Sequence, residues 1–449
     1  MGGFDFSSGE GAFVLIAGVI GFIVLAFMAT KRRLLTVPMG AMLFASCLGV
    51  PLNPNGTMIR TVWLPLQTER SGLFLMFGIA LGMHTVFHLR GIVGKFPSAQ
   101  AFGVMLMGYY AALLRFAHVS PADSMLSMLY ASATLLPLWL AVPNLMDAFE
   151  DAFRILRMIS AVNLLWILGV AVQVGVNPQG VVVGREQRFV GLLANPQHAG
   201  CLVAVFLAVS LYLFLNDSHK RVRLANLVLV GANVILLAWS GSRTGLGMAV
   251  LGVTGVLYAR VGRAILWLPA MAIAAVIMFK ILEVLGVEVG FARLASTENT
   301  RASAWNTLYQ RGLDSPVIGN GVQGAGDSEN GYLYGFASYG VGMILLIFTL
   351  IAISAFTSLK LWARRKYLPV QYKALADMLI AYNAVYFGGS FFEGYMMARV
   401  AANLTFFMIF AGMASALIQL TDRHVRAARL APPEDEHAEP YGMDPHPAV

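Results

Sequence analysis

Residues 291–342 read FARLASTENTRASAWNTLYQRGLDSPVIGNGVQGAGDSENGYLYGFASYGVG. They form a polar segment in a chain whose other residues belong mostly to long apolar runs. Polar loops of this length are usually functional or disordered. This one is not of low complexity, because it combines a helix-like stretch at 300–312, an aromatic anchor at Trp305 and a Pro/Gly turn at 314–326. We therefore expect the apolar runs to form a scaffold that holds this segment.

The composition is that of a membrane protein. Hydrophobic residues make up 58% of the chain and charged residues 12%, and the mean hydropathy is +0.70. Soluble domains contain roughly 45–50% apolar and about 25% charged residues. Both cysteines, Cys47 and Cys201, stand in apolar runs, which predicts small buried side chains and neither a disulfide nor a metal site.

Thirteen apolar runs are candidates for membrane spans. A helix that crosses a bilayer needs about 20 apolar residues. The runs must be helical, because the bilayer interior holds no water to satisfy an open strand edge. The expected fold is an all-α polytopic membrane protein with about 12–13 transmembrane helices and one long external, periplasmic loop before the last three. The runs lie at 12–30, 34–50, 71–89, 98–117, 124–143, 155–175, 197–215, 224–241, 244–259, 264–286, 332–355, 374–392 and 401–420.

Lysine and arginine set the expected orientation. Alternate loops, counted from the first run, hold 20 of the 31 basic residues, and such an excess is typical of the cytoplasmic side. This alternation predicts an external N-terminus and a cytoplasmic C-terminus, with a Pro- and acid-rich tail at 422–449 that is expected to be disordered. The basic residues on this side are Lys31, Arg32, Arg33, Arg90, Lys95, Arg154, Arg157, Lys220, Arg221, Arg223, Arg260, Arg263, Lys360, Arg364, Arg365, Lys366, Lys373, Arg423, Arg426 and Arg429.

The other side carries arginine almost exclusively. Of its eleven basic residues only Lys280 is a lysine, and that residue lies inside an apolar run. Topology does not distinguish Lys from Arg, whereas the planar donor fork of Arg suits phosphate and carboxylate groups. The bias indicates recognition of an anion; a genome rich in Arg codons is the alternative. The arginines are Arg60, Arg70, Arg115, Arg185, Arg188, Arg243, Arg293, Arg301, Arg311 and Arg399.

A first polar cluster, GREQRFVGLLANPQHAG, occupies residues 184–200 on this outer side. If the segment is helical, Arg185 and Arg188 point the same way. Asn195 followed by Pro196 is typical of a helix start, with Asn as the cap and Pro at the first helical position. The alternative to anion binding is a plain capped helix beside a solvated basic loop.

A second cluster, SGSRTG, occupies residues 240–245 at the outer end of another run. Small residues permit close helix packing, and glycine interrupts the helix locally. An arginine at such a break, facing a cavity, is a candidate functional residue. The alternative is that Arg243 only extends toward the membrane interface.

The third cluster lies in the polar segment itself. Arg301 falls on the first turns of the amphipathic stretch, near Trp305, and Arg311 follows at its end. Glu329 stands just before the next apolar run, where desolvation would raise the pKa of its carboxyl and nearby arginines would lower it. It can act as a general base or orient a hydroxyl. The alternative is a residue that only favours the helix start through the helix dipole.

Glu393 and Arg399 flank the outer gap between the last two runs. The alternative to anion binding by Arg399 is that these two residues only pair with each other. His198 is expected to be a hydrogen-bonded packing residue. Among the eight histidines only His84 and His88 show helical ligand spacing, and they lack a third ligand. We therefore expect no metal and no cofactor.

Three motifs, in order and on one side of the membrane, resemble those of the O-antigen ligase/O-antigen polymerase superfamily. RFVGLLANPQHAG at 188–200 resembles the family's outer-loop motif, and LLAWSGSRTGLGM at 236–248 resembles its second motif. Residues 301–343 resemble its long periplasmic loop, in which a Pro/Gly turn leads into a His-Asn-x-Tyr-Leu helix start. The resemblance covers about residues 180–355.

The chain departs from the family pattern at two positions. Glu329 stands directly before Asn330, where the family usually has His. Thr244 follows Arg243, where the family usually has Gly. Glu in place of His preserves a possible base.

The resemblance implies a metal-independent, inverting glycosyltransferase of the GT-C type in a bacterial inner membrane. Its donor would be a glycan on undecaprenyl diphosphate at the outer leaflet. Its acceptor would be a sugar hydroxyl on lipid A–core, as in a ligase, or on another lipid-linked glycan, as in a polymerase. Preorganised arginines would stabilise the charge that grows on the leaving diphosphate. No nucleic acid is expected as a partner.

On this hypothesis the candidate catalytic residues are Glu329, which would deprotonate or orient the acceptor hydroxyl, Arg243 and Arg301. The candidate diphosphate-binding residues are Arg185, Arg188, Asn195, Asn330, Arg311 and Arg399. Four regions are expected: N-terminal transmembrane helices at 1–179, a ligase-like catalytic region at 180–355 with its periplasmic loop at 287–331, C-terminal transmembrane helices at 356–421, and the tail at 422–449.

Two other functions remain open. A polysaccharide-lipid transporter or flippase would need charged or broken helices near mid-membrane in a repeat arrangement. The charges here collect at the outer edge, and the sequence shows no internal repeat. A non-catalytic scaffold for envelope assembly gains weight from the missing histidine.

Overall fold

The computed structural model describes residues 34–51, 58–59, 61–88, 97–184, 187–268, 270, 274, 277, 301–325, 329–397 and 401–430. Helices dominate this part of the chain. The α-helices are α2 (Thr36–Ser46), α3 (Leu64–Thr68), α4 (Arg70–Phe87), α5 (Ala99–His118), α6 (Pro121–Leu145), α7 (Asp151–Val176), α8 (Pro196–Asn216), α9 (Lys220–Ser240), α10 (Arg243–Val261), α13 (Ala302–Asp314), α14 (Gly321–Ala325), α15 (Gly331–Arg364), α16 (Val370–Ser390) and α17 (Ala402–Leu430).

Short elements connect these helices. The 3-10 turns are η3 (Pro178–Val181), η4 (Gly262–Leu266), η5 (Arg365–Tyr367) and η6 (Gly394–Met397). Strands β1 (Val182–Val183) and β2 (Arg188–Phe189) pair antiparallel between α7 and α8, with Val182 opposite Phe189. Arg185 and Arg188 were expected to point the same way if their segment is helical. Arg188 instead lies on a strand of a small hairpin.

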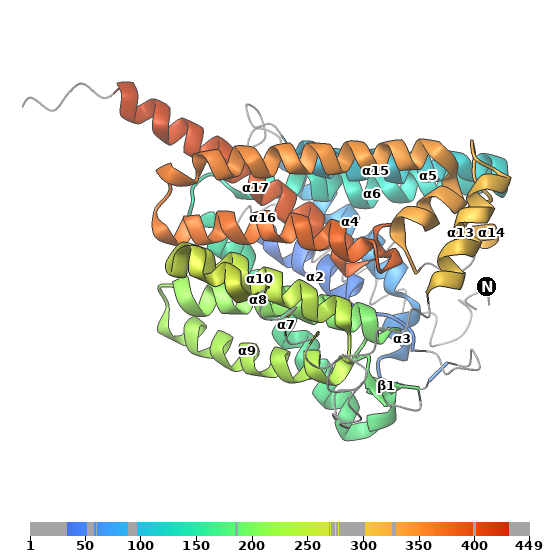
Figure 1. Cartoon of the computed structure of the whole chain (residues 1–449), viewed down its shortest axis with the longest axis horizontal. Helices are drawn as coiled ribbons and strands as arrows, with labels where there is room; N and C mark the ends of the chain where they lie inside the picture. The colour runs from blue at the N-terminus through green and yellow to red at the C-terminus, as the bar shows by residue number, and fades with distance from the viewer. Residues whose placement is uncertain are drawn as a thin grey trace, which may run out of the picture.

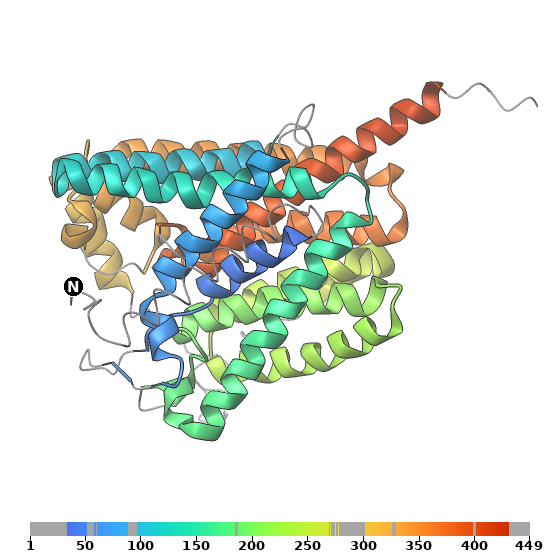
Figure 2. The ribbon, with the colours of Figure 1, turned by 180° about the vertical axis from the view of Figure 1, so that it is seen from behind.

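The long helices run side by side as one bundle (Figure 1). α13, α14, α3 and β1 gather at one end, called here the α13 end, while α17 extends beyond the other end. Seen from behind, α2 lies between α4 and α7 and contacts both (Figure 2). α13 and α14, which belong to the polar segment, therefore lie at one end of the bundle.

Eight described helices are long and apolar enough to cross a membrane, namely α4, α6, α7, α8, α9, α10, α15 and α17. α2 is apolar but shorter, and α5 and α16 have spanning length without being among the eight. An all-α polytopic membrane protein is thus confirmed. The predicted run at 12–30 and most of the run at 264–286 lie outside the described residues.

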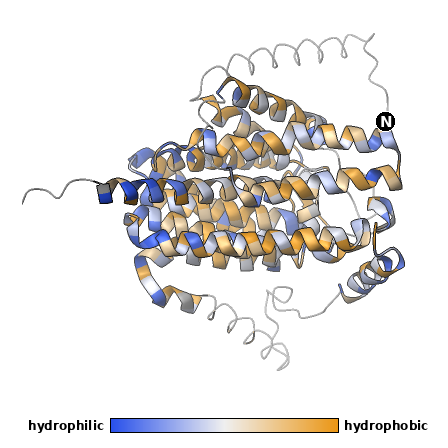
Figure 3. Cartoon of the chain, turned by 90° about the horizontal axis from the view of Figure 1, so that it is seen from above, coloured by the Kyte–Doolittle hydropathy of each residue, from blue (hydrophilic) through white to orange (hydrophobic). Residues whose placement is uncertain are grey.

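Burial separates central from peripheral helices. In the most apolar 18-residue stretch of each helix, 78% of the residues of α8 and 72% of those of α17 are buried. The share in α9 is 22%. The sides of the bundle are largely apolar, and blue polar stretches stand out near the helix ends (Figure 3). Apolar side chains that face outward along the sides of such a bundle suit a lipid environment, so α9 reads as a lipid-facing helix and α8 as part of the core.

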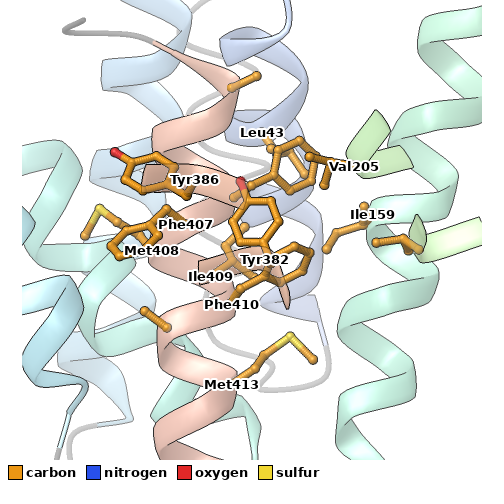
Figure 4. Close-up of a cluster of buried hydrophobic side chains, with 14 of the residues drawn as sticks. Leu43, Ile159, Val205, Tyr382, Tyr386, Phe407, Met408, Ile409, Phe410 and Met413 are labelled. Carbon is orange, nitrogen blue, oxygen red and sulfur yellow. The ribbon is translucent and has the colours of Figure 1, made fainter. Parts of the chain in front are cut away.

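Aromatic stacking joins α16 to α17 in the middle of the bundle (Figure 4). The Tyr386 ring stacks on Phe407 with 4.1 Å between centroids, and the Tyr382 ring meets Phe410 edge-on at 4.6 Å. These rings pack with side chains of α2, α7 and α8 in one continuous core. Both cysteines are free and buried there, as predicted.

The polar segment is docked onto α15. Gly340 interrupts that helix with a φ of 72°, a conformation that favours glycine. At this kink the Val341 amide donates to the Pro316 carbonyl across 2.7 Å, and the Asn320 amide donates to the Ala337 carbonyl across 2.8 Å. The predicted helix at 300–312 is confirmed as α13. A turn at 316–318 lies within the predicted Pro/Gly turn, and backbone hydrogen bonds at Pro316 and Asn320 hold it against α15.

The end opposite α13 carries three two-pronged arginine–carboxylate pairs. Their shortest N–O distances are 2.6–2.7 Å, and each joins two helices or a helix and a connecting loop. Such planar pairs fix helix positions well. The pairs are Arg157–Asp217, Arg364–Asp422 and Arg365–Asp377.

Candidate active site

A cavity of about 610 Å³ opens at the α13 end, between α10 and α16. Its walls combine two arginines with amide, hydroxyl, aromatic and aliphatic side chains. The lining residues are Gln197, Arg243, Thr244, Gly247, Met248, Leu251, Arg301, Trp305, Ala384, Val385, Gly388, Gly389 and Phe392. The cavity therefore brings together Arg243, at the start of α10, and Arg301, in the polar segment.

Glu393 lies at the centre of the polar contacts beside this cavity. Its side chain is 6% exposed, and its Oε1 accepts a hydrogen bond from Arg301 Nη2 across 2.9 Å. Arg301 Nη1 donates to the neighbouring Phe392 carbonyl. The Thr244 hydroxyl also hydrogen-bonds the Glu393 carboxylate, and His198 Nε2 lies 3.9 Å from its Oε2. One buried carboxylate thus links α8, α10 and the start of α13.

Burial raises the pKa of Glu393 above its ordinary value of 4.5, although the Arg301 guanidinium and the Thr244 hydroxyl oppose the change. The neighbouring charge of Glu329 adds to the rise. Glu329 itself is partly buried, and its Oε2 has no hydrogen-bond partner within the part of the chain that the structure describes. The site therefore holds two carboxylates with different surroundings: Arg301 binds Oε1 of Glu393, whereas Oε2 of Glu329 has no partner among the described residues.

The start of α15 fixes the position of Glu329. Asn330 caps this helix, since its Oδ1 accepts from the Tyr332 and Leu333 amides across 2.9 and 3.0 Å. Gly331 lies against the segment that follows α16, where a Cβ would approach the Ser390 carbonyl oxygen to 3.0 Å. Asn330 is 1% exposed, so its side-chain amide caps α15 from a buried position beside the site.

Two helix starts converge beside the cavity. Asn195 caps α8 by accepting from the Gln197 amide across 2.8 Å, and the Ser242 hydroxyl caps α10 by accepting from the Gly245 amide across 3.0 Å. The two helices cross so closely that a Cβ on Gly245 would lie 2.5 Å from the Gly200 carbonyl carbon. Small residues at 200 and 245 permit this crossing.

Arg188 holds the turn between α9 and α10. Its Nε donates to the Ser240 carbonyl across 3.0 Å and its Nη2 to the Gly241 carbonyl across 3.4 Å. Gly241 ends α9 in the left-handed conformation with a φ of 57°. The predicted helix break is confirmed, and Arg188 supports the turn that presents Arg243.

Aromatic side chains border the cavity on the α13 side. The Trp305 ring meets the Phe391 ring nearly edge-on, with 5.1 Å between centroids. The Trp305 Nε1 is buried and has no hydrogen-bond partner among the described residues. Phe391 and Phe392 are each almost half exposed. Flat aromatic faces beside carboxylates and a free N–H donor form a surface that suits a polar ring compound.

Of the residues singled out in the sequence, three belong to this site. Arg243 and Arg301 line the cavity, and Glu329 lies near Glu393. Arg188, Asn195 and Asn330 are placed around it, in the contacts described above. Arg311 is ten residues beyond Arg301, about 15 Å farther along a helix, and does not line the cavity. Arg185 and Arg399 lie outside the described residues.

Sequence reasoning missed the central role of Glu393. The sequence offered Arg399 as its partner, and Arg399 lies outside the described residues; the structure pairs Glu393 with Arg301. His198, expected to be a packing residue, lies within 3.9 Å of the same carboxylate. A signal was present, because Glu393 follows the apolar run of α16 just as Glu329 precedes that of α15.

The arrangement favours chemistry on an anionic, ring-containing substrate. Two arginines supply positive charge, and two carboxylates can accept a proton. Within the described ranges, no group of three or more His, Cys, Asp or Glu side chains is arranged to hold a metal ion. No protein-family model matches the sequence, and no curated protein matches it significantly.

Proposed function

We propose that this protein is a glycosyltransferase of the O-antigen ligase/polymerase type. It would transfer or polymerise a glycan from undecaprenyl diphosphate onto an acceptor sugar hydroxyl. The observation that carries the proposal is the meeting of Arg243 and Arg301 in one cavity beside two carboxylates, Glu329 and Glu393. These residues come from the segments whose motifs resemble that superfamily, and from the last connection of the bundle.

The charges of the site suit an inverting displacement. Glu329 takes the proton of the acceptor hydroxyl. The oxygen of that hydroxyl attacks the anomeric carbon from the face opposite the leaving group. The bond from that carbon to the diphosphate oxygen breaks, and its electron pair leaves with the diphosphate. Arg243 and Arg301 stabilise the negative charge that develops there. The mechanism is metal-independent in this proposal.

The contacts of the two carboxylates support different roles for them. Glu393 Oε1 is engaged by Arg301, and its carboxylate also binds Thr244. Glu393 therefore positions the arginine. Glu329 Oε2 is buried and has no partner in the described part of the chain, so a hydrogen bond to an acceptor hydroxyl would satisfy it. A base must be within hydrogen-bond reach of the proton it removes.

The shape of the cavity suits a donor with a lipid tail. Along α10 its lining changes from Arg243 and Thr244 through Gly247 to Leu251, that is, from charged to apolar over about two turns. Gly388 on α16 faces the same space, and a Cβ at Gly247 or Gly388 would meet no atom within 4 Å. A diphosphate at the arginines could thus extend its isoprenoid chain along α10 and α16.

The membrane arrangement follows from the same proposal. The α13 end would face outward from a bacterial inner membrane, with about 12–13 transmembrane helices, an external N-terminus and a cytoplasmic C-terminus. The basic residues that pair with Asp217, Asp377 and Asp422 cluster at the opposite end, in keeping with that orientation.

The test is glycan transfer by purified protein in detergent. Undecaprenyl diphosphate glycan and candidate acceptors are supplied with EDTA, and wild type is compared with Glu329→Gln. Exposed Glu69 at the same end provides the matched control, Glu69→Gln. Transfer by wild type and Glu69→Gln, but not by equally folded Glu329→Gln, supports the enzyme and its base.

Equal transfer by all three proteins would refute the assignment of Glu329. Binding of the lipid diphosphate without transfer to any acceptor would favour the transporter or the scaffold. Translocation of the lipid-linked glycan across proteoliposomes then separates these two.

A further inference from the structure

A second cavity, of about 100 Å³, lies on the other side of α16, along the seam between α5 and α6. The residues that α5 contributes recur every three or four positions from Val104 to Arg115. This stripe runs about 16 Å along the helix. Because so small a volume extends over that length, the cavity is a narrow slot. Most of its wall is apolar, with Met107, Leu135 and Met343 among the lining side chains.

Arg115 and Tyr386 are two of the polar side chains that line this slot. Arg115 lies toward the α13 end, where its Nη1 donates to the Ser127 hydroxyl across 3.0 Å. Tyr386 lines the slot and is fully buried, and its hydroxyl has no hydrogen-bond partner among the described residues. Figure 4 shows this hydroxyl on the far side of the ring from Val205 and Ile159. A buried hydroxyl without a partner is costly, so it calls for a ligand atom or a water.

The slot also borders the lipid-facing surface. On α5, Leu113 and Phe116 flank Arg115 and are more than half exposed. On α6, Met125 and Leu126 precede Ser127 and are 63% exposed each. Apolar side chains are thus exposed on both helices beside Arg115. They place the mouth of the slot where acyl chains would lie in a membrane.

We infer that this slot binds one chain of an anionic phospholipid. Arg115 binds the headgroup phosphate, the Tyr386 hydroxyl donates to an ester oxygen of the lipid, and the chain lies along α5 and α6. A guanidinium is well suited to phosphate, and an alkyl chain is the ligand that a narrow apolar slot accepts. The ligand is a lipid and not free phosphate, because the apolar wall is far longer than a phosphate ion.

This site is separate from the proposed active site and does not rest on glycan transfer. Glu393 and Met396 belong to the same short connection after α16, but Glu393 lies among the contacts of the larger cavity while Met396 lines the slot. A lipid in the slot would therefore pack against the back of the segment that carries Glu393.

Native mass spectrometry of the full chain released from detergent measures the binding. Palmitoyl-oleoyl phosphatidylglycerol is the probe, with phosphatidylcholine of the same chains and inorganic phosphate as comparisons. We expect Arg115→Gln to weaken phosphatidylglycerol binding about ten-fold, because one charge-assisted contact is lost. Tyr386→Phe should weaken it several-fold, and Ala111→Phe, which fills the slot, should abolish it. Arg311→Gln and Leu106→Phe, an outward change on the same helix at a side chain that does not line the slot, should bind as wild type does.

A photoactivatable phosphatidylglycerol with a diazirine in its acyl chain tests wild type alone. Its crosslinks should fall on peptides of α5, α6 or α15 that line the slot. Unchanged binding in Arg115→Gln and Ala111→Phe, or crosslinks spread evenly over the lipid-facing helices, would overturn the inference. Equal affinity for phosphatidylcholine would also overturn it. If inorganic phosphate binds as tightly as the lipid, the slot recognises an anion and not a lipid chain, and the inference fails.

Discussion

Arg301 and Glu393 lie 92 residues apart in the sequence, and Arg301 Nη2 donates to Glu393 Oε1 across 2.9 Å. Their side chains are 20% and 6% exposed. This ion pair ties the start of α13 to the connection between α16 and α17. It thereby fixes one arginine of the proposed active site against the bundle.

Removal of Arg301 should destabilise the protein by about 3 kcal/mol, because it leaves the Glu393 charge buried without its partner. Thermal unfolding of Arg301→Met in detergent, followed by intrinsic fluorescence, measures the change. The double variant Arg301→Met/Glu393→Gln should recover part of the loss, since the unpaired charge is gone. A double variant that loses the sum of both single effects would show that the two side chains act independently.

Stability should depend on pH through Glu393. Its pKa is raised on folding by burial, so the folded protein holds this proton more tightly than the unfolded chain does. The stabilisation is therefore fully present below the ordinary value of 4.5 and is lost as pH rises through the folded pKa. We expect wild type to lose stability relative to Glu393→Gln over the interval just above 4.5. The melting temperatures of the two proteins, measured from pH 4 upward, check this. A wild-type melting temperature that stays constant or rises relative to that of Glu393→Gln as pH increases contradicts it.

Gly245→Ala should disturb the crossing of α8 and α10. Its Cβ would lie 2.5 Å from the Gly200 carbonyl carbon, so the helices must separate and Arg243 must move. Overpacking of this kind costs roughly 1–3 kcal/mol. Gly231→Ala on α9 is the control, because a Cβ there meets no atom within 4 Å. The control should be neutral or slightly stabilising, since Ala favours a helix over Gly. Equal melting temperatures for the two variants would argue against a tight crossing.

Gly388→Phe should block the larger cavity without unfolding the protein. Gly388 lines that cavity, and a Cβ there meets no atom within 4 Å. We expect at least a ten-fold loss of affinity for undecaprenyl diphosphate glycan and an unchanged melting temperature. Gly175→Phe on α7, another exposed glycine with open space around it, is the control and should bind as wild type does. Full binding by Gly388→Phe would place the donor elsewhere.

Much of the helical framework could be predicted because its signals are local. The length of each apolar run predicts a helix, and Asn195 with Pro196 predicts where α8 begins. Gly241 likewise predicts the end of α9, which the structure confirms. The hairpin at Arg188 was missed, because two paired residues per strand leave almost no alternating pattern to detect.

The site could be predicted only in part. Arg243, Arg301 and Glu329 stood out as charged residues at the edges of apolar runs. The same kind of signal at Glu393 did not reveal its pairing with Arg301, because nothing in the sequence near residue 393 indicates that α13 folds over it. The slot along α5 and α6 was not foreseen, since it depends on Tyr386 from a helix more than 250 residues away from α5.

The sequence by itself determined that this is a multi-helix membrane protein with a polar segment between its apolar runs, because hydrophobic run length, caps and helix breaks act within about 20 residues. Only the tertiary structure decided which charges meet. Arg301 pairs with Glu393, Arg188 supports the turn before Arg243, and Arg311 stays apart, because these outcomes depend on how the helices pack. Packing brings residues together through contacts that no local pattern encodes.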